Sequence, residues 1–559
     1  MINISCLHYS TGRCDDYVSP SSTQATIRRT IQRTIRRSPR VLINTTTGRL
    51  YHKTDQASAF EALPLFNELV SSVTRRIDIV RIKREVRQFF RYVMFSHTWE
   101  ANEPSFDQVV HIAVYDLEKS PTHDKLQTFC KVVRDAGFTW AWSDTCCVNK
   151  AGHFELQEAL PAMFEWYRGA ALVIVFLRGV HSSSRRGALV RSIWNTRAWA
   201  LQEYIAAKVI RFYTEDWTLY LDRQVSNHKN SPGIISEMEE ATGVSAQQLR
   251  ALRPGLTNIR EKLRLASTRQ TTHVEDVAYS LFGIFGVIGV PVVYGEGEKS
   301  LGRLLAHILS GSGDTSILAW TGESGSFHSC LPARITMFNG PATSHLPRLI
   351  PNDEMERIVT TSSSPSFDLD VALRLYDRLK ELPPPSFSGQ RMQLPCIAFK
   401  LPPLTPYQTL SGHFYRADTA TFGIIEIKTG QNLSQLGSLY LIHPWLDIIP
   451  GRTVTQRDTS EDEVAPRSPN TDDEDIDDDS SFFEPEERPP PIPFRIVMNR
   501  EMGARQLVAR LRQPFGALLF AQTSTDYRRI AADSLITVQF QENVSLVDVL
   551  DHVQTLGTL

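Results

Sequence analysis

Apolar residues between about 90 and 215 follow two alternating spacings along the chain. Short, almost continuous apolar or aromatic runs predict buried strands. They lie at 92–96, 138–143, 170–177 and 209–214. Between them, apolar residues recur at the i, i+3, i+4 spacing of amphipathic helices. The helices are predicted at 122–136, 154–168 and 197–207. Strands that alternate with helices indicate βαβ units and a parallel sheet, so we predict an α/β fold.

Residues 1–40 have a different pattern, rich in Ser, Thr and Arg. Ile27, Ile31 and Ile35 recur at every fourth position, and arginines stand between them. On a helix this spacing gives a narrow apolar stripe and a cationic remainder. We favour a disordered basic leader or a solvated surface helix. The alternative is a basic arm for a membrane surface or an acidic partner, such as the acidic tract of this chain.

The rest of the chain is predicted to contain one large folded region and a β-rich one. The first spans 41–325, with its α/β core at about 90–215 and a helical completion at about 234–320. Beyond it, prolines cluster and short β-prone runs recur. We expect a β-rich region at 326–455 that resumes at 494–559, interrupted by a disordered acidic linker at 456–493.

Composition narrows the class of protein. Hydrophobic residues make up 42% of the 559 residues, enough for sizeable cores. The formal net charge is −2, although residues 458–487 alone hold 14 acidic residues and one Arg. This balance gives no argument for nucleic acid as a partner. No apolar run reaches the ~20 residues of a membrane span, and no signal-peptide core opens the chain, so we expect a cytoplasmic protein without a transmembrane segment.

Polar residues that could carry chemistry stand where predicted parallel strands end. Ser96-His97-Thr98-Trp99 follows the first strand, and Ser143-Asp144 follows the second. The segment 194–203, WNTRAWALQE, opens the helix after the third. Open parallel sheets bind ligands at the carboxyl ends of their strands. We therefore expect these three segments to form one site.

Six ordered motifs resemble the HET (heterokaryon incompatibility) domain of filamentous fungi. They are LINTTTGRL at 42–50, FSHTW at 95–99, WSDTCCVN at 142–149, WNTRAWALQE at 194–203, TTHVEDVAYSLFGIF at 271–285 and VYGEGEK at 293–299. The resemblance implies non-self recognition that triggers cell death. It also implies a fold similar to the TIR domain, a flavodoxin-like parallel sheet flanked by helices. Self-association and an unknown protein trigger are the partners that we expect.

Many TIR relatives cleave NAD+ at the nicotinamide–ribose bond with one glutamate, and the resemblance places that role on Glu203. NAD+ would then be the substrate, and we expect no cofactor and no metal. Six further residues are candidates for substrate binding. They are Ser96, Trp99, Asp144, Arg197, Trp199 and Gln202.

Other interpretations stay open for these residues. Trp142, Trp194 and Trp199 are typical of core aromatics. Glu275 and Asp276 would suit the start of a helix, where the helix dipole favours acids.

Two other function classes remain open besides the glutamate scheme. One is a non-catalytic signalling module that works through self-association. The other is a cysteine-dependent hydrolase in which Cys146 or Cys147 is the nucleophile and His97 or His153 the base. Adjacent cysteines at a strand end are more often small packing residues, so we favour the glutamate scheme.

Overall fold

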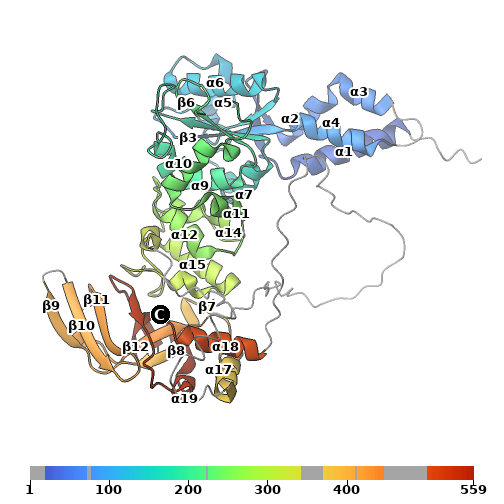
Figure 1. Ribbon diagram of the computed structural model, residues 1–559. Coiled ribbons are helices and arrows are strands. Elements are labelled where there is room, and N and C mark those ends of the chain that lie inside the picture. The colour runs from blue at the N-terminus through green and yellow to red at the C-terminus, as the bar shows by residue number, and fades with distance from the viewer. Residues whose placement is uncertain are drawn as a thin grey trace, which may run out of the picture. The chain divides into compact units, whose positions relative to one another are not determined.

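The computed structural model of the chain divides into two compact units, Met1–Leu304 and Leu305–Leu559 (Figure 1). The structure describes residues 19–71, 77–221, 224–340, 369–409, 412–445, 500–524 and 526–559. The predicted acidic linker at 456–493 lies outside these described residues.

A six-stranded sheet forms the centre of the first unit, in the order β2-β1-β4-β3-β5-β6. Its strands are β1 (Val41–Asn44), β2 (Leu50–His52), β3 (Tyr92–His97), β4 (Trp140–Trp142), β5 (Leu172–Leu177) and β6 (Ile210–Thr214). Strands β4, β3, β5 and β6 run parallel, whereas β1 pairs antiparallel with β4 and β2. The predicted α/β core with a parallel sheet is confirmed.

Helices connect the parallel strands, as the apolar periodicity predicts. They are α5 (Phe106–Val109), α6 (Pro121–Asp135), α7 (His153–Gly169), α8 (Ile193–Thr196) and α9 (Ala198–Ala206). Every residue of β3 and of β5 is buried, which explains why these strands read as continuous apolar runs. Ser120 caps the start of helix α6, since its side chain accepts from the amide of His123, and Pro121 opens the first turn.

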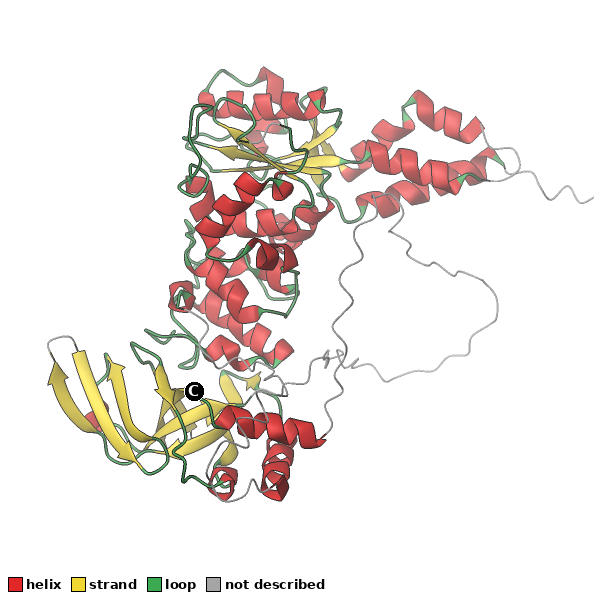
Figure 2. Ribbon diagram, viewed as in Figure 1, coloured by secondary structure: helices red, strands yellow, loops and turns green. Residues whose placement is uncertain are grey.

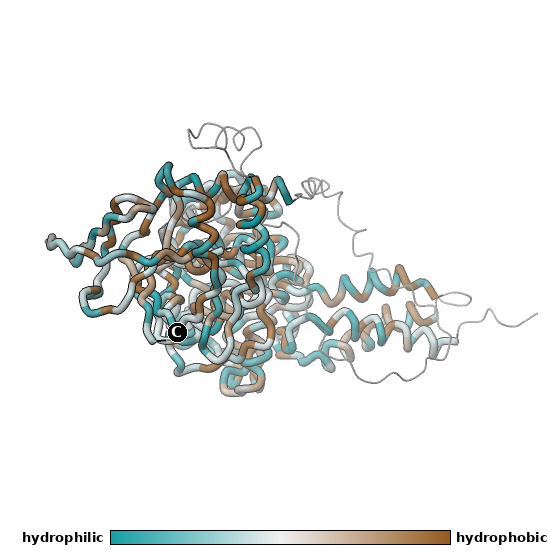
Figure 3. Tube along the Cα trace, turned by 90° about the horizontal axis from the view of Figure 1, so that it is seen from below, coloured by the Kyte–Doolittle hydropathy of each residue, from teal (hydrophilic) through white to brown (hydrophobic). Residues whose placement is uncertain are grey.

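The N-terminal segment is ordered from Pro20 onward, so the predicted disordered leader is wrong over this stretch. Helix α1 (Pro20–Ile35) packs with α2 (Lys53–Glu61), α3 (Pro64–Ser71) and α4 (Ile79–Phe89). Its isoleucines, Ile27, Ile31 and Ile35, lie in a buried cluster with Phe60 and Val86. Apolar and polar residues alternate along these helices (Figure 3). Because the apolar stripe is covered by helices of the same unit, it is not a free membrane-binding face.

The predicted helical completion follows β6. It consists of α10 (Pro232–Thr242), α11 (Ala246–Ala251), α12 (Ile259–Ser267), α13 (Asp276–Tyr279), α14 (Phe282–Phe285) and α15 (Lys299–Ser312). Gly283 allows α14 to approach α7, since a Cβ at this position would lie 2.1 Å from Cβ of Phe164. None of the helices in the described ranges is long and apolar enough to cross a membrane.

The second unit is rich in strands, as predicted (Figure 2). Two sheets contain β7 (Ser386–Ser388), β8 (Arg391–Lys400), β9 (Thr405–Thr409), β10 (Gly412–Thr419), β11 (Gly423–Thr429), β12 (Leu439–Pro444), β13 (Phe515–Thr523), β14 (Asp526–Ile530), β15 (Ile536–Val538) and β16 (Val553–Thr558). Its helices are α17 (Leu369–Glu381), α18 (Arg500–Leu511) and α19 (Leu546–Leu550). Leu375 of α17 and Leu507 of α18 share one buried cluster with Phe399 of β8, so the helices cover a face of the sheet.

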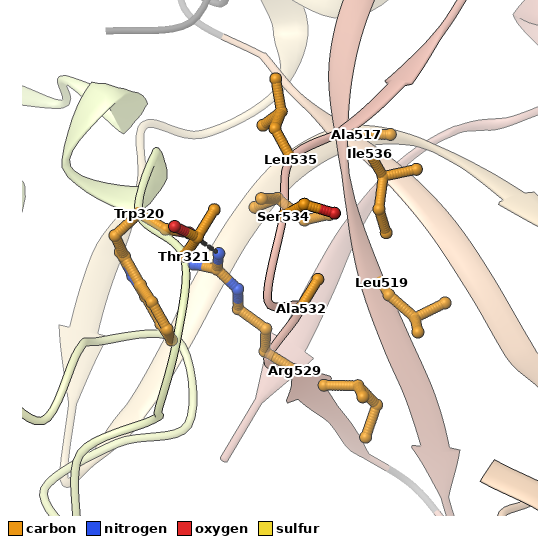
Figure 4. A pocket seen from close by; sticks show the side chains of 11 residues that line it. Trp320, Thr321, Ala517, Leu519, Arg529, Ala532, Ser534, Leu535 and Ile536 are labelled. Atoms are coloured by element: carbon orange, nitrogen blue, oxygen red, sulfur yellow. Dashed lines mark hydrogen bonds between the residues drawn. The ribbon is translucent and has the colours of Figure 1, made fainter. Parts of the chain in front are cut away.

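The second unit also contains a buried arginine beside a small cavity (Figure 4). The Arg529 guanidinium stacks on the Trp320 ring, 3.8 Å from its centroid, and donates to the carbonyls of Leu318 and Trp320. The cavity measures about 10 Å³, which is room for about one water molecule. We therefore assign this arginine a structural role that ties the 318–320 segment to β14.

Candidate functional site

The candidate site lies at the carboxyl ends of the parallel strands. Ser96 and His97 end β3, and Asp144 follows β4 by two residues. Glu203 lies on α9, in the connection from β5 to β6. The order of the strands reverses here, because the chain moves from β3 to β4 on one side and then to β5 on the other. Ligands of open parallel sheets bind at such a switch point.

The Glu203 carboxylate is held by a short chain of buried side chains. The Ser96 hydroxyl donates to Oε2 of Glu203, and the same hydroxyl oxygen accepts a hydrogen bond of 2.7 Å from Nε1 of Trp194. Glu203 is only 3% exposed, and Trp194 and Ser96 are also buried. The position of Oε2 of Glu203 is therefore fixed by side chains from the strand β3 and from the adjacent helices α8 and α9.

Burial raises the pKa of Glu203 to about 7. The positive charge of Arg197 and the hydrogen bond from Ser96 act in the opposite direction, and the negative charge of Asp144 adds to the rise. Arg197 forms no ion pair with Glu203, since its Nη1 donates to the carbonyl of His97. Within the described residues the carboxylate is thus desolvated, without a direct salt bridge.

Trp99 and Asp144 form a second, more open pair at the same strand ends. Nε1 of Trp99 donates to Oδ2 of Asp144 at 2.8 Å, and the tryptophan side chain is 47% exposed. Nζ of Lys150 lies 3.5 Å from the centroid of the Trp99 ring. The ring face therefore already accepts a cation, as expected for an electron-rich indole.

Two of the candidate residues have other contacts. Gln202 is fully buried, and its amide nitrogen donates to Sδ of Met163 at 3.7 Å. Trp199 donates to Oδ2 of Asp276 at 3.3 Å. The structure thus joins Ser96 to Glu203 directly and Trp99 to Asp144 directly, whereas Gln202 and Trp199 contact neither pair through a hydrogen bond.

The motifs at 271–285 and 293–299 are linked to each other around α13. Oε1 of Glu275 accepts hydrogen bonds of 2.8 and 2.9 Å from the amides of Gly295 and Gly297. Asp276 accepts from Tyr294 at 2.9 Å and from Trp199. These acids hold the YGEG turn and the start of α9, which accounts for both motifs without a ligand.

Two residues that contact the site or the helix junction beside it were not singled out for this from the sequence. Trp194 stands in the WNTRAWALQE motif, but a buried tryptophan gives no sign that its N–H holds a serine. Arg269 stands outside every motif, and it contacts the junction of α8 and α9 from more than 70 positions away. Its sequence gives little signal, because α12 just before it already carries four charged residues.

The cysteine pair does not have the surroundings of a nucleophile. Cys146 and Cys147 are both buried, and burial raises the pKa of Cys147 well above its ordinary value. A thiolate is the reactive form, and this environment disfavours it. The His97 ring is also buried, and both its nitrogens lack a hydrogen-bond partner in the described part of the chain. No cluster of His, Cys, Asp and Glu suited to a metal ion occurs among the described residues.

The raised pKa of Glu203 predicts a pH-dependent stability. An unfolded glutamate titrates near 4.5, whereas Glu203 in the folded chain titrates near 7. The protonated form is therefore favoured by folding, and this stability is complete below pH 4.5 and is lost as the pH rises to about 7. The difference amounts to roughly 3 kcal/mol.

Urea unfolding of wild type and Glu203→Gln at several pH values measures this loss. The stability of the variant relative to wild type should increase between pH 4.5 and 8, because all other titrating groups are shared. Parallel stability curves over that interval would contradict the assignment.

Comparison with known proteins identifies a similar family over part of the chain. The family model for the heterokaryon incompatibility protein (HET) matches residues 92–189, which include Ser96, Trp99 and Asp144 and end before α8. The vegetative incompatibility protein HET-E-1 of Podospora anserina is 34% identical over 232 residues, which is 39% of this chain and 16% of the relative. No solved structure matches the chain. Residues 92–189 of the chain are therefore similar to the heterokaryon incompatibility (HET) family.

Proposed function

We propose that this protein acts in heterokaryon incompatibility as an effector that triggers cell death. The HET domain and a relative that is named a vegetative incompatibility protein support this role. The chain spans 16% of that relative's length, so the relative's full activity does not carry over directly. The reaction must therefore be inferred from the residues of this chain.

We infer that the domain hydrolyses NAD+ at the nicotinamide–ribose bond. The parallel strands follow the order β4-β3-β5-β6, or 2-1-3-4 by their sequence in the chain. Flavodoxin-like sheets have this order and bind their ligand at the switch between the first and third strands. That position corresponds to the ends of β3 and β5, where Ser96 lies opposite Val175. The topology thus supports a TIR-like fold with a ligand site beside Ser96.

The observation that carries the proposal is the desolvated Glu203 carboxylate at this position. When the bond between C1′ of the ribose and the nicotinamide nitrogen breaks, its electron pair leaves with neutral nicotinamide. The ribose is left as an oxocarbenium-like cation, which a nearby carboxylate stabilises strongly at low dielectric. Water then attacks C1′ and loses a proton to solvent, which gives ADP-ribose.

Neighbouring residues suit the rest of the substrate. The Trp99 ring already lies against the Lys150 ammonium, so it can stack on the cationic nicotinamide ring. Arg197 supplies a guanidinium for phosphate or for the ribosyl hydroxyls. The Ser96 hydroxyl fixes one carboxylate oxygen of Glu203, and the Tyr167 hydroxyl also lies within reach of this buried carboxylate.

Incubation of the full chain with NAD+ tests this function. Nicotinamide and ADP-ribose should appear in equal amounts by liquid chromatography, and the product should be lost in Glu203→Gln. Cys146→Ser and Cys147→Ser should retain the activity. Absence of nicotinamide from every assembled form of wild type would sink the proposal, and loss of activity in the cysteine variants alone would favour the hydrolase.

Self-association is a second candidate function, favoured by exposed apolar side chains. Phe154 and Ile288 are 75% and 84% exposed. Val292 donates its amide to Gln157 at 3.0 Å, so the Phe154 end of α7 lies beside the 288–294 loop. Exposed apolar side chains on neighbouring segments are candidates for an interaction surface.

Sedimentation of wild type and of Phe154→Ser/Ile288→Ser measures this association. The double variant should shift the assembly toward monomer at equal concentration, with an unchanged melting temperature. If cell death on expression persists in Glu203→Gln but disappears in the double variant, the non-catalytic module is the better description.

A further inference from the structure

Arg269 is a buried cation whose side chain, among the described residues, donates its hydrogen bonds to the junction of α8 and α9. The side chain lies just after α12, and the residue is 6% exposed. Its Nη1 donates to the carbonyl of Asn195 at 2.8 Å and to that of Arg197 at 3.0 Å. Its Nη2 donates to Oδ1 of Asn195 at 3.4 Å. No carboxylate forms an ion pair with Arg269 in the described part of the chain.

The backbone beside Arg269 completes this attachment. The amide of Gln270 donates to the carbonyl of Thr196 at 2.7 Å, and the amide of Ala198 donates to the carbonyl of Gln270 at 2.9 Å. Three consecutive carbonyls, 195 to 197, therefore receive donors from residues 269 and 270. The last carbonyls of a helix as short as α8 lack partners within the helix, so these donors satisfy groups that water would otherwise have to reach.

The junction needs such an attachment because its own sequence provides no cap. Arg197 is extended, with φ −76° and ψ 137°, and it both ends α8 and begins α9 without a side-chain cap. The guanidinium of Arg197 is directed to the carbonyl of His97. Glu203 follows on the same helix, so the direction in which α9 begins determines where its carboxylate lies.

We propose that Arg269 is a positioning residue that fixes the α8–α9 junction and thereby orients Arg197 and Glu203 at the end of β3. This inference rests on the proposed function for its catalytic consequence, but its structural consequence can be measured without it. A buried guanidinium suits the task, since its rigid fork of donors reaches two carbonyls at once, whereas an ammonium acts as a point charge. The charge also matters, because the negative charge of Glu203 opposes the fall that burial causes in the Arg269 pKa.

Replacing Arg269 by Met or by Lys in the full chain tests the proposal. Hydrogen exchange at residues 195–203 should become faster in both variants and stay unchanged in β3 and β5. For nicotinamide release, kcat should fall roughly 100-fold with KM within about threefold, since a misplacement of about 1 Å has that effect. The lysine variant keeps the charge but not the fork, so it should fold and still lose the rate.

Arg529→Met provides a matched control. Arg529 is also a buried arginine that donates to backbone carbonyls, but it lies in the second unit. Its replacement should leave exchange at 195–203 and the rate of nicotinamide release unchanged.

Wild-type exchange at 195–203 in both Arg269 variants would overturn the positioning role, and so would an unchanged kcat. Faster exchange throughout the domain would show a general structural role instead. If wild type releases no nicotinamide, the proposed function fails, while the local exchange still decides the role of Arg269.

Discussion

Replacing Glu203 by Gln abolishes nicotinamide release if the proposed chemistry is correct. Glutamine keeps the size of the side chain and can still accept a hydrogen bond from Ser96, but it carries no charge. The cationic ribosyl centre then loses its counter-charge in a desolvated site, where removal of one stabilising group reduces the rate at least ~100-fold. Single-turnover measurement of nicotinamide release, with the protein in excess over NAD+, gives this rate.

Glu237→Gln serves as the control for this variant. Glu237 is also buried in the first unit, and its carboxylate accepts from the Tyr220 hydroxyl at 3.0 Å. It lies on α10, away from the ends of β3 and β4. Equal losses of activity in both variants would show that the loss follows from burial of a glutamate in general, and retention of activity in Glu203→Gln would remove the carboxylate from the mechanism.

The activity should also depend on the protonation of Glu203. The carboxylate form stabilises a cation, and the pKa lies at about 7, so the rate should rise with pH through this value. The stability of the folded chain should change in the opposite direction over the same interval. The carboxylate form of Glu203 would thus support catalysis and lower the stability of the folded chain. Such a trade-off between activity and stability is typical of a functional site.

Replacing Ile31 by Asp should unfold the N-terminal helices. Ile31 is 1% exposed in the cluster formed by α1, α2, α3 and α4. The change removes buried apolar volume and places a carboxylate in the cluster, for which we expect a loss of about 4 kcal/mol. Hydrogen exchange at 20–35 and at 79–89 would then approach the rate of an unfolded chain.

Gln32→Asp is the matched control, because Gln32 is the adjacent residue on α1 and is exposed. It introduces the same charge without entering the cluster, and exchange should stay close to wild type. If both variants exchange as slowly as wild type, α1 does not depend on its isoleucine stripe. If wild type itself exchanges at the rate of an unfolded chain over 20–35, the segment is the disordered leader predicted from its composition.

The alternation of strands and helices could be read from the sequence. Strands β3 and β5 are buried on both faces, so their residues are apolar except for Ser96 and His97 at the end of β3, and the connecting helices bury one stripe. Local spacing therefore carries the information, and the predicted elements of the core agree with the structure. Helix α1 was assigned wrongly because its short stripe, centred on Ile31, becomes favourable only when another helix covers it.

The candidate site was predictable only in part. The strand ends indicated Ser96 and Asp144, since parallel strands bring their carboxyl ends to one edge. The hydrogen bond from Trp99 to Asp144 and the chain from Trp194 through Ser96 to Glu203 join side chains that are 45 to 107 positions apart. No local pattern records such contacts.

The sequence by itself determined the α/β class, the strand-rich second region and the family motifs, because each depends on local spacing. Tertiary structure alone decided that Glu203 is desolvated beside Ser96. It also decided that Arg269 donates to the junction where α9, the helix of Glu203, begins. The pKa of a carboxylate and the direction of a helix depend on neighbours that are distant along the chain, and only folding brings those neighbours together.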